Sequence, residues 1–255
     1  MLKKSSSKPS TSRTLVTFLL DRTGSMQSIK DDTIGAFNAY LEGLQKEGDG
    51  IEFTLVQFDS MSLDKICVAL RVKNAKPLTD ASYQPRASTP LIDAAYKTIK
   101  AVETSLGNDK GKTKVVICIQ TDGQENCSTE HTWDELNALI KEKSGLGWQF
   151  NFMGCGIDAY EQGQKMGIDA MSTMSYDRTN REATKAAFAA SASNTTGFAR
   201  GRLSSTEYSM SQRSAAKDAW AHKAAGSPSL APPPSARAPQ PKPAAKAPIV
   251  DDLVL

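Results

Sequence analysis

The stretch Phe18-Leu19-Leu20-Asp21-Arg22-Thr23-Gly24-Ser25-Met26 decides the fold prediction. The apolar run Leu15–Leu20 stops at Asp21, and the apolar residues that follow the stretch recur at helical spacing. This pattern predicts a buried strand, a tight turn and the first turn of a helix. Such a turn gathers the side chains of Asp21, Thr23 and Ser25 above the carboxyl end of the strand.

Three side-chain oxygens on a five-residue loop suit a hard divalent cation, which prefers carboxylate, hydroxyl and water oxygens. The same residues also have a purely structural explanation. An aspartate commonly ends a strand, and a serine commonly caps a helix. The residues that follow in the chain are needed to distinguish a metal site from this structural explanation.

Strand-like and helix-like segments alternate along the chain. The second and third strands are separated only by residues 59–64, which is too short for a crossover helix, so we expect an antiparallel pair at a sheet edge. The nearly continuous apolar run 113–120 is typical of a central parallel strand covered on both faces. We expect strands at 14–20, 51–58, 65–72, 113–120, 148–155 and 171–176, and helices at 26–46, 90–106, 133–144, 159–166, 180–197 and 205–222.

Several helix starts carry the spacing of a capping box, in which a hydroxyl residue precedes Glu by three positions. We expect such boxes at Thr132 with Glu135, at Thr179 with Glu182, and at Ser204 with Glu207. Together these patterns predict a doubly wound α/β domain over residues 14–222. Its central sheet is mostly parallel, with one antiparallel edge strand.

The two ends of the chain differ from this domain in composition. Residues 1–13 are rich in Ser, Lys and Pro and carry a charge of +4, so we expect a disordered tail. Residues 223–248 form a Pro/Ala-rich linker that cannot bury a core. It leads to an apolar tip around two acids, which is either a docking peptide for a second protein partner or a plain tail: Ile249, Val250, Asp251, Asp252, Leu253, Val254 and Leu255.

Charge and hydropathy exclude several classes of function. The net charge is +3, to which residues 1–13 contribute +4 and residues 225–255 contribute +1, so residues 14–224 carry −2 and show no basic face for nucleic acid. No segment approaches the length of a membrane span, and the apolar run before Asp21 lacks the cleavage site of a signal peptide. The four cysteines show no zinc spacing, and three lie in apolar runs, which favours free thiols and a cytoplasmic location over disulfides.

Oxygen-bearing residues from three separate places are predicted to meet at one edge of the sheet. Asp21, Thr23 and Ser25 follow the first strand, Thr89 opens a helix, and Asp122 follows the strand 113–120. In an open α/β sheet, ligands bind outside the carboxyl ends of strands where the winding reverses direction. Two carboxylates neutralise a divalent ion, and three hydroxyls add ligands without charge, so with no third carboxylate the ion keeps a strong attraction for an outside anion.

This set of residues resembles the metal-ion-dependent adhesion site of von Willebrand factor type A domains. That family's signature is Asp-x-Ser-x-Ser, then a distant Thr and a distant Asp, and here Thr23 replaces the first serine. The resemblance covers roughly residues 14–176. Within the family, the chain is similar to the short intracellular members from bacteria and phages. It implies Mg²⁺ or Mn²⁺ as the cofactor, an acidic side chain of a protein partner as the last ligand, an ATPase-containing complex as one candidate partner, and no enzymatic activity.

Two other functions compete with this interpretation. A Mg²⁺-dependent phosphohydrolase would use Asp21 as its nucleophile, but phosphatases of the haloacid dehalogenase type place a second aspartate where this chain has Thr23. A scaffold with a vestigial metal site would fold normally and ignore divalent ions. Asp93 either orients the Thr89 loop or stabilises the positive end of its helix.

Overall fold

The computed structural model describes residues 13–47, 50–107, 113–156 and 158–220. Six strands form one sheet in the order β3-β2-β1-β4-β5-β6, and only the β2–β3 pair is antiparallel. This confirms the predicted doubly wound α/β fold with one antiparallel edge strand. The strands are β1 (Thr14–Asp21), β2 (Ile51–Asp59), β3 (Ser62–Arg71), β4 (Lys114–Thr121), β5 (Gln149–Cys155) and β6 (Thr173–Tyr176).

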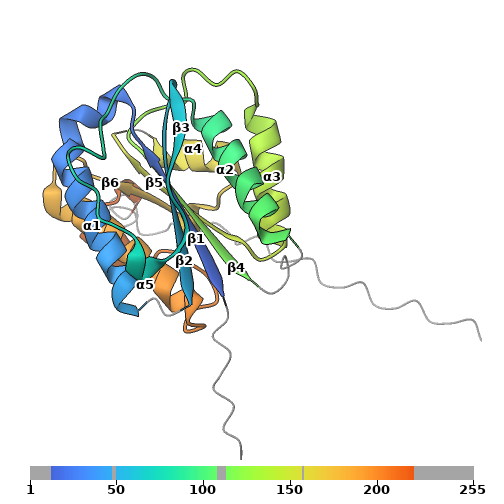
Figure 1. Cartoon of the computed structure of the whole chain (residues 1–255). Helices are drawn as coiled ribbons and strands as arrows, with labels where there is room; N and C mark the ends of the chain where they lie inside the picture. The colour runs from blue at the N-terminus through green and yellow to red at the C-terminus, as the bar shows by residue number, and fades with distance from the viewer. Residues whose placement is uncertain (1–12, 48–49, 108–112, 157, 221–255) are drawn as a thin grey trace, which may run out of the picture.

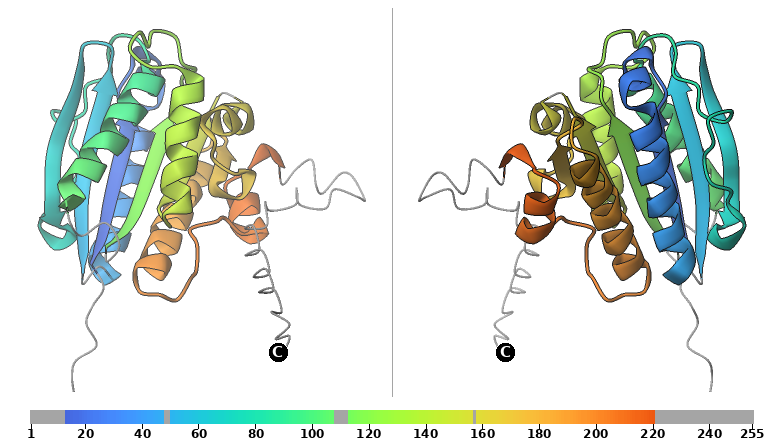
Figure 2. Two further views of the ribbon diagram at one scale, coloured as in Figure 1. Left: turned by 90° about the vertical axis from the view of Figure 1, so that its right-hand side faces the viewer. Right: turned by 90° about the vertical axis from the view of Figure 1, so that its left-hand side faces the viewer.

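Helices cover both faces of the sheet (Figure 1). One apolar core lies between the sheet and α1 and α5, and a second lies between the sheet and α2, α3 and α4. Figure 2 shows the two layers face-on, with α2 and α3 in front of the sheet in the left view and α1 and α5 in front of it in the right view. The α-helices are α1 (Lys30–Glu47), α2 (Leu91–Leu106), α3 (Trp133–Gly145), α4 (Ala159–Met166), α5 (Arg181–Ala199) and α6 (Met210–Ala215), and the 3₁₀ helices are η1 (Gly24–Ile29), η2 (Val72–Asn74) and η4 (Ala170–Ser172).

The central strands are buried because both faces are covered. All eight residues of β1 are buried, and Val16, Phe18 and Leu20 point to one core while Leu15 and Leu19 point to the other. This alternation between two apolar cores explains why the strand reads as a nearly continuous apolar run rather than as an amphipathic one.

Two predicted boundaries around the first three strands are wrong. The helix expected from Met26 begins as the 3₁₀ helix η1, and α1 starts only at Lys30. The connection expected over 59–64 is a two-residue turn, because β3 starts at Ser62. The Asp59 carboxylate accepts hydrogen bonds from the backbone N–H groups of Met61 (2.7 Å) and Ser62 (2.9 Å), so a polar stretch that looks like a loop is instead a tight hairpin.

Two of the three expected capping boxes are also wrong. The box of Thr132 and Glu135 is confirmed at the start of α3. At α5 the cap is Asn180, whose side chain accepts from the Ala183 N–H, because the Thr179 hydroxyl donates to Asp177 instead. Residues 204–208 are not helical, since the Asn194 side-chain amide donates to the carbonyls of residues 206 and 207, and the last box is Ser209 with Gln212.

The structure describes only part of the predicted chain ends. Arg13 was expected in a disordered tail, but it lies in the described part of the chain and pairs with Glu52 at 2.8 Å. Other predictions fall outside the described residues: those for residues 1–12, for the linker, for the tip and for the helix end at His222.

All four cysteines are free thiols, and Cys67 is only half-buried, whereas Cys118 and Cys155 are buried. Among the described residues, no helix combines the length and apolarity needed to cross a membrane.

Candidate metal centre

The winding of the sheet reverses between β1 and β4. The chain runs from β1 outward to β2 and β3, and then returns to place β4 on the other side of β1. These two strands are parallel and in register, with Leu20 opposite Gln120. Asp21 at the end of β1 and Asp122 just after β4 therefore leave the sheet side by side, as the sequence predicts.

The Asp21 carboxylate is fully buried and held at both oxygens. Oδ1 accepts a hydrogen bond from the Thr23 backbone N–H at 2.6 Å, and Oδ2 accepts one from the Thr121 hydroxyl. The Asp21 carbonyl accepts from the buried Tyr83 hydroxyl at 2.5 Å. These contacts fix the orientation of the Asp21 side chain and the first turn of the loop that follows it.

Burial of the two carboxylates makes their negative charges costly. It raises the pKa of Asp21 to about 6, although hydrogen bonds from Thr121 and Thr23 act in the opposite direction. Burial also raises the pKa of Asp122, against the opposing hydrogen bond from Ser25 and the charge of Arg178. Two adjacent carboxylates with raised pKa values form a site that a cation would stabilise.

The three hydroxyls lie next to the carboxylates. The Ser25 Oγ donates to Asp122 Oδ1 at 2.5 Å and lies 3.2 Å from the Thr23 Oγ1. A Cβ atom on Gly123 would lie 2.9 Å from the Thr89 Oγ1 and 3.6 Å from the Ser25 Oγ. The space over Gly123 is therefore a small cradle lined by hydroxyl oxygens, and a side chain at this position would fill it.

One oxygen of the site has no hydrogen-bond partner among the described residues. Asp122 Oδ2 is buried, and its ion-pair partner is the Arg178 guanidinium, with Nη1 at 3.5 Å. An unsatisfied buried carboxylate oxygen beside a cradle of hydroxyls fits a hard divalent cation. Over the described ranges, no three His, Cys, Asp or Glu residues cluster in a way that could hold a metal, so the hydroxyls are needed to complete the ligand set.

The Thr89 loop is held by the segment that follows Asp122. Asn126 accepts from the Thr89 N–H through its side chain at 2.9 Å, and its own N–H donates to the Thr89 carbonyl at 3.1 Å. The Asp93 carboxylate accepts hydrogen bonds from the backbone N–H groups of residues 129–131, so it braces the segment that carries Asn126.

The structure brings together all five predicted ligands: Asp21, Thr23, Ser25, Thr89 and Asp122. Four further residues of the site were missed from the sequence, namely Tyr83, Thr121, Asn126 and Arg178. Of these, only Thr121 carries a local signal, because its hydroxyl directly precedes Asp122 at the end of β4. Tyr83 and Arg178 reach the site from distant segments, and Asn126 follows Asp122 closely but contacts Thr89, 37 positions away, which no local pattern reveals.

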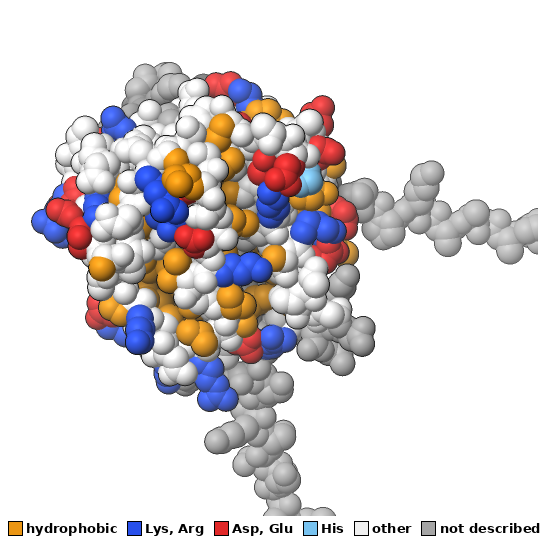
Figure 3. All heavy atoms as spheres, turned by 45° about the horizontal axis from the view of Figure 1, so that its top comes forward, with side chains coloured by type: hydrophobic (Ala, Val, Ile, Leu, Met, Phe, Trp, Pro, Cys, Tyr) orange, Lys and Arg blue, Asp and Glu red, His pale blue; other side chains and the backbone are white. Residues whose placement is uncertain are grey.

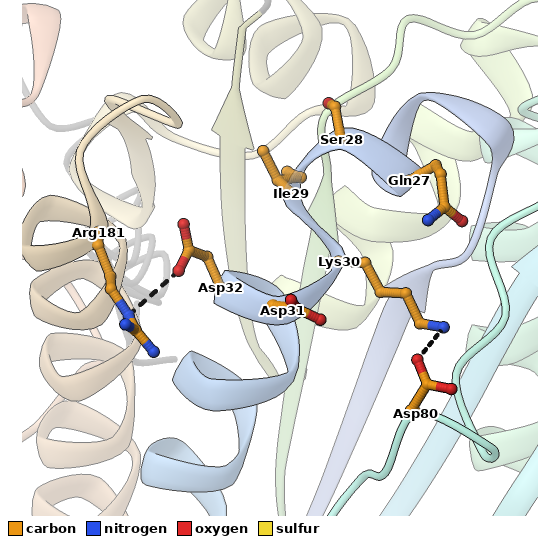
Figure 4. A pocket seen from close by; sticks show the side chains of 8 residues that line it. All are labelled: Gln27, Ser28, Ile29, Lys30, Asp31, Asp32, Asp80 and Arg181. Atoms are coloured by element: carbon orange, nitrogen blue, oxygen red, sulfur yellow. Dashed lines mark ion pairs between the residues drawn. The ribbon is translucent and has the colours of Figure 1, made fainter.

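A polar hollow of about 490 Å³ lies beside the site, where η1 passes into α1. Two ion pairs line it, between Lys30 and Asp80 at 2.5 Å and between Arg181 and Asp32 at 3.2 Å (Figure 4). Acidic, basic and hydrophobic side chains are interspersed on the face that Figure 3 brings forward. This face therefore carries charges of both signs rather than a field of one sign.

Comparison with known proteins shows similarity of structure but not of sequence. The chain matches no protein-family model and no curated protein. The pilus adhesin SpaC from Lactobacillus rhamnosus GG is similar with a TM-score of 0.58 and 13% identity, over 74% of this chain and 30% of SpaC. The manganese-loaded Plasmodium vivax TRAP protein is similar with a TM-score of 0.50 and 14% identity, over 66% of this chain and 70% of TRAP.

A third similar structure is a von Willebrand factor type A protein from Catenulispora acidiphila, with a TM-score of 0.50 and 15% identity. The match covers 73% of this chain and 43% of that protein. The chain thus spans less than half the length of the SpaC and Catenulispora structures that it matches. At these identities the similarity concerns the fold, and with the sheet order and the switch point it shows that the chain has the von Willebrand factor type A fold.

Proposed function

We propose that this chain is a protein-binding module whose interaction depends on a divalent cation, Mg²⁺ or Mn²⁺. The observation that carries the proposal is the convergence of two buried carboxylates and three hydroxyls at the carboxyl ends of β1 and β4, with two of the hydroxyls over Gly123 and one carboxylate oxygen left without a hydrogen bond among the described residues. The manganese-loaded state of TRAP supports the choice of metal, since TRAP is similar in fold.

The residues of the site have separate tasks. Asp21 and Asp122 supply the negative charge that holds the ion, while Thr23, Ser25 and Thr89 supply neutral oxygens. When bound, the ion offers a positive charge to an acidic side chain of a protein partner. Because the chain itself contributes only two carboxylates, the ion keeps an attraction for that outside anion.

Two narrower proposals rest on the resemblance of the motif to short intracellular bacterial and phage proteins. The partner belongs to an ATPase-containing complex, and the interaction takes place in the cytoplasm. The structure bears on a third, that the module is not an enzyme. Asp21 is buried and both of its oxygens accept hydrogen bonds, so it is badly placed to attack a phosphate.

Affinity capture tests the proposal. The tagged chain and its Asp122→Ala variant are incubated with a lysate of the source organism, with Mg²⁺ or with a chelator. We expect proteins that are captured by the unmodified chain in Mg²⁺ and lost in both other arms. Capture that survives chelation and Asp122→Ala would contradict the proposal, as would Mg²⁺-dependent hydrolysis of an aryl phosphate that Asp21→Ala abolishes.

A further inference from the structure

Arg178 lies beside the candidate metal centre although no motif contains it. It follows β6 in the short connection to α5, and its Nη1 lies 3.5 Å from Asp122 Oδ2. Ser25 binds the other oxygen of that carboxylate. The guanidinium thus faces the oxygen that lacks a hydrogen bond.

The backbone around Arg178 is built to hold this position. Gly156, just after β5, has φ of +67°, and a Cβ there would lie 3.1 Å from both Cδ and Nη1 of Arg178. A glycine at 156 therefore leaves room for the guanidinium to cross the end of β5. On the other side, Asp177 accepts from the Thr179 N–H at 2.9 Å, which fixes the connection while the Arg178 side chain stays 41% exposed.

The guanidinium still has donors to offer. Among the described residues, Arg178 makes the ion pair with Asp122 and no hydrogen bond. A guanidinium presents its N–H groups as a planar fork that matches the two oxygens of a carboxylate. An acidic side chain that approaches the metal centre would therefore also meet this fork.

We propose that Arg178 couples cation binding to the binding of a carboxylate from the partner. This inference rests on the proposed function, and the charges of the site support it. Two carboxylates neutralise a divalent cation, so Arg178 leaves the loaded site with one positive charge in excess, which an incoming carboxylate cancels. Without Arg178 the same carboxylate would leave the site negative. Arg178 repels the cation and so weakens its binding when no anion is present. An incoming carboxylate offsets this repulsion, so the cation and the carboxylate each strengthen the binding of the other.

Titration of the protein with Mg²⁺ by calorimetry tests the coupling, with acetate as the carboxylate probe. The unmodified chain, Arg178→Gln, Arg178→Lys and Arg181→Gln are each titrated in sodium chloride and in sodium acetate of equal ionic strength. Arg181 is the matched control, because it lies three residues away and pairs with Asp32 at the neighbouring hollow (Figure 4). Association of acetate with free Mg²⁺ is the same for all four proteins and cancels in the comparison.

We expect the unmodified chain and Arg181→Gln to bind Mg²⁺ more tightly in acetate than in chloride. Arg178→Gln should bind Mg²⁺ about two- to fivefold more tightly in chloride, as expected for the loss of a partly exposed charge, and should gain less from acetate than the unmodified chain does. Arg178→Lys keeps the charge but not the fork, so its affinity in chloride should stay near that of the unmodified chain and its gain from acetate should shrink.

Two results would overturn the coupling and leave the proposed function intact. One is an Arg178→Gln variant that behaves like Arg181→Gln in both buffers. The other is an Arg178→Gln variant that binds Mg²⁺ more weakly in chloride, which would make Arg178 a brace for Asp122. If the unmodified chain bound Mg²⁺ in neither chloride nor acetate, both the coupling and the proposed function would be overturned.

Discussion

Thr23 is the residue at which the site departs from the serine of the type A motif. It is buried, and its hydroxyl lies 3.2 Å from that of Ser25, so the extra methyl is accommodated without moving the oxygen away. We expect Thr23→Ser to keep Mg²⁺ binding. Thr23→Val retains the shape but removes the oxygen, and we expect it to lower Mg²⁺ affinity by about tenfold or more, measured by calorimetry. Equal affinities in the two variants would remove Thr23 from the ligand set.

The raised pKa values of the two carboxylates predict a pH dependence. In the cation-free protein the pKa of Asp21 is about 6 instead of 3.8, so between these values the folded state holds a proton that the unfolded state has lost. Asp21 thus lowers the stability of the cation-free protein as the pH rises through that window. The cation requires the ionised carboxylate, so protons compete with it.

We therefore expect the gain in melting temperature caused by a fixed concentration of Mg²⁺ to be smaller at about pH 5 than at about pH 7.5. Thermal unfolding at both pH values, with and without Mg²⁺, measures it. An Mg²⁺ effect that is the same at both would mean that no carboxylate of raised pKa binds the ion.

At the scale of the elements, patterns within a segment were predictable from the sequence and contacts between segments were not. The strand-turn-helix around Asp21 and the capping box of Thr132 follow from local spacing, and the structure contains both. The hydrogen bond from Thr121 to Asp21 joins residues 100 positions apart. The cap of α5 was misplaced by one residue, because Thr and Asn both cap helices and the choice depends on where Asp177 lies.

The segment that carries α6 gives a prediction about stability. Arg213 and Asp218 are fully buried and paired at 2.9 Å, and Arg213 also donates to the carbonyl of Thr173 at 2.7 Å. Asp218→Ala leaves the arginine charge buried without its carboxylate, so we expect a loss of about 3–5 kcal/mol in the free energy of unfolding, measured with urea. The control is Lys185→Ala, which breaks the partly exposed pair with Glu182 and should change stability by about 0.5 kcal/mol or less. A similar small effect of Asp218→Ala would show that the buried pair does not anchor α6.

At the scale of the whole molecule, the winding of the sheet explains why the site lies where it does. Because β1 and β4 are neighbours whose following helices lie on opposite faces of the sheet, the loops after the two strands diverge and leave a space that receives Asp21 and Asp122. The sequence predicts this switch point from one short connection, residues 59–64, since it fixes β3 as an edge strand. The position of Arg178 depends on β5 and β6 as well, which is why it could not be predicted.

The tip, residues 249–255, makes a separate prediction about partners, and it lies outside the described residues. We propose that it binds a second protein partner, because five large aliphatic residues surround two acids after a polar linker. Deletion of 249–255 should leave the melting temperature and the Mg²⁺ response unchanged and should weaken one protein interaction in affinity capture. A truncated chain that captures the same proteins equally well would identify the tip as a plain tail.

The most direct test of the metal centre is the effect of Mg²⁺ on thermal unfolding of the chelator-treated protein. The unmodified chain is compared with Asp21→Ala, with Asp122→Ala and with Asp134→Ala, an exposed acid at the start of α3 that serves as control. At about a hundred times the dissociation constant, binding to the folded state adds about 2.7 kcal/mol, which corresponds to a rise in melting temperature of about 5–10 °C. We predict this rise in the unmodified chain and in Asp134→Ala and its absence in the two site variants. Equal rises in all four proteins, or none in the unmodified chain, would contradict the assignment of a metal centre.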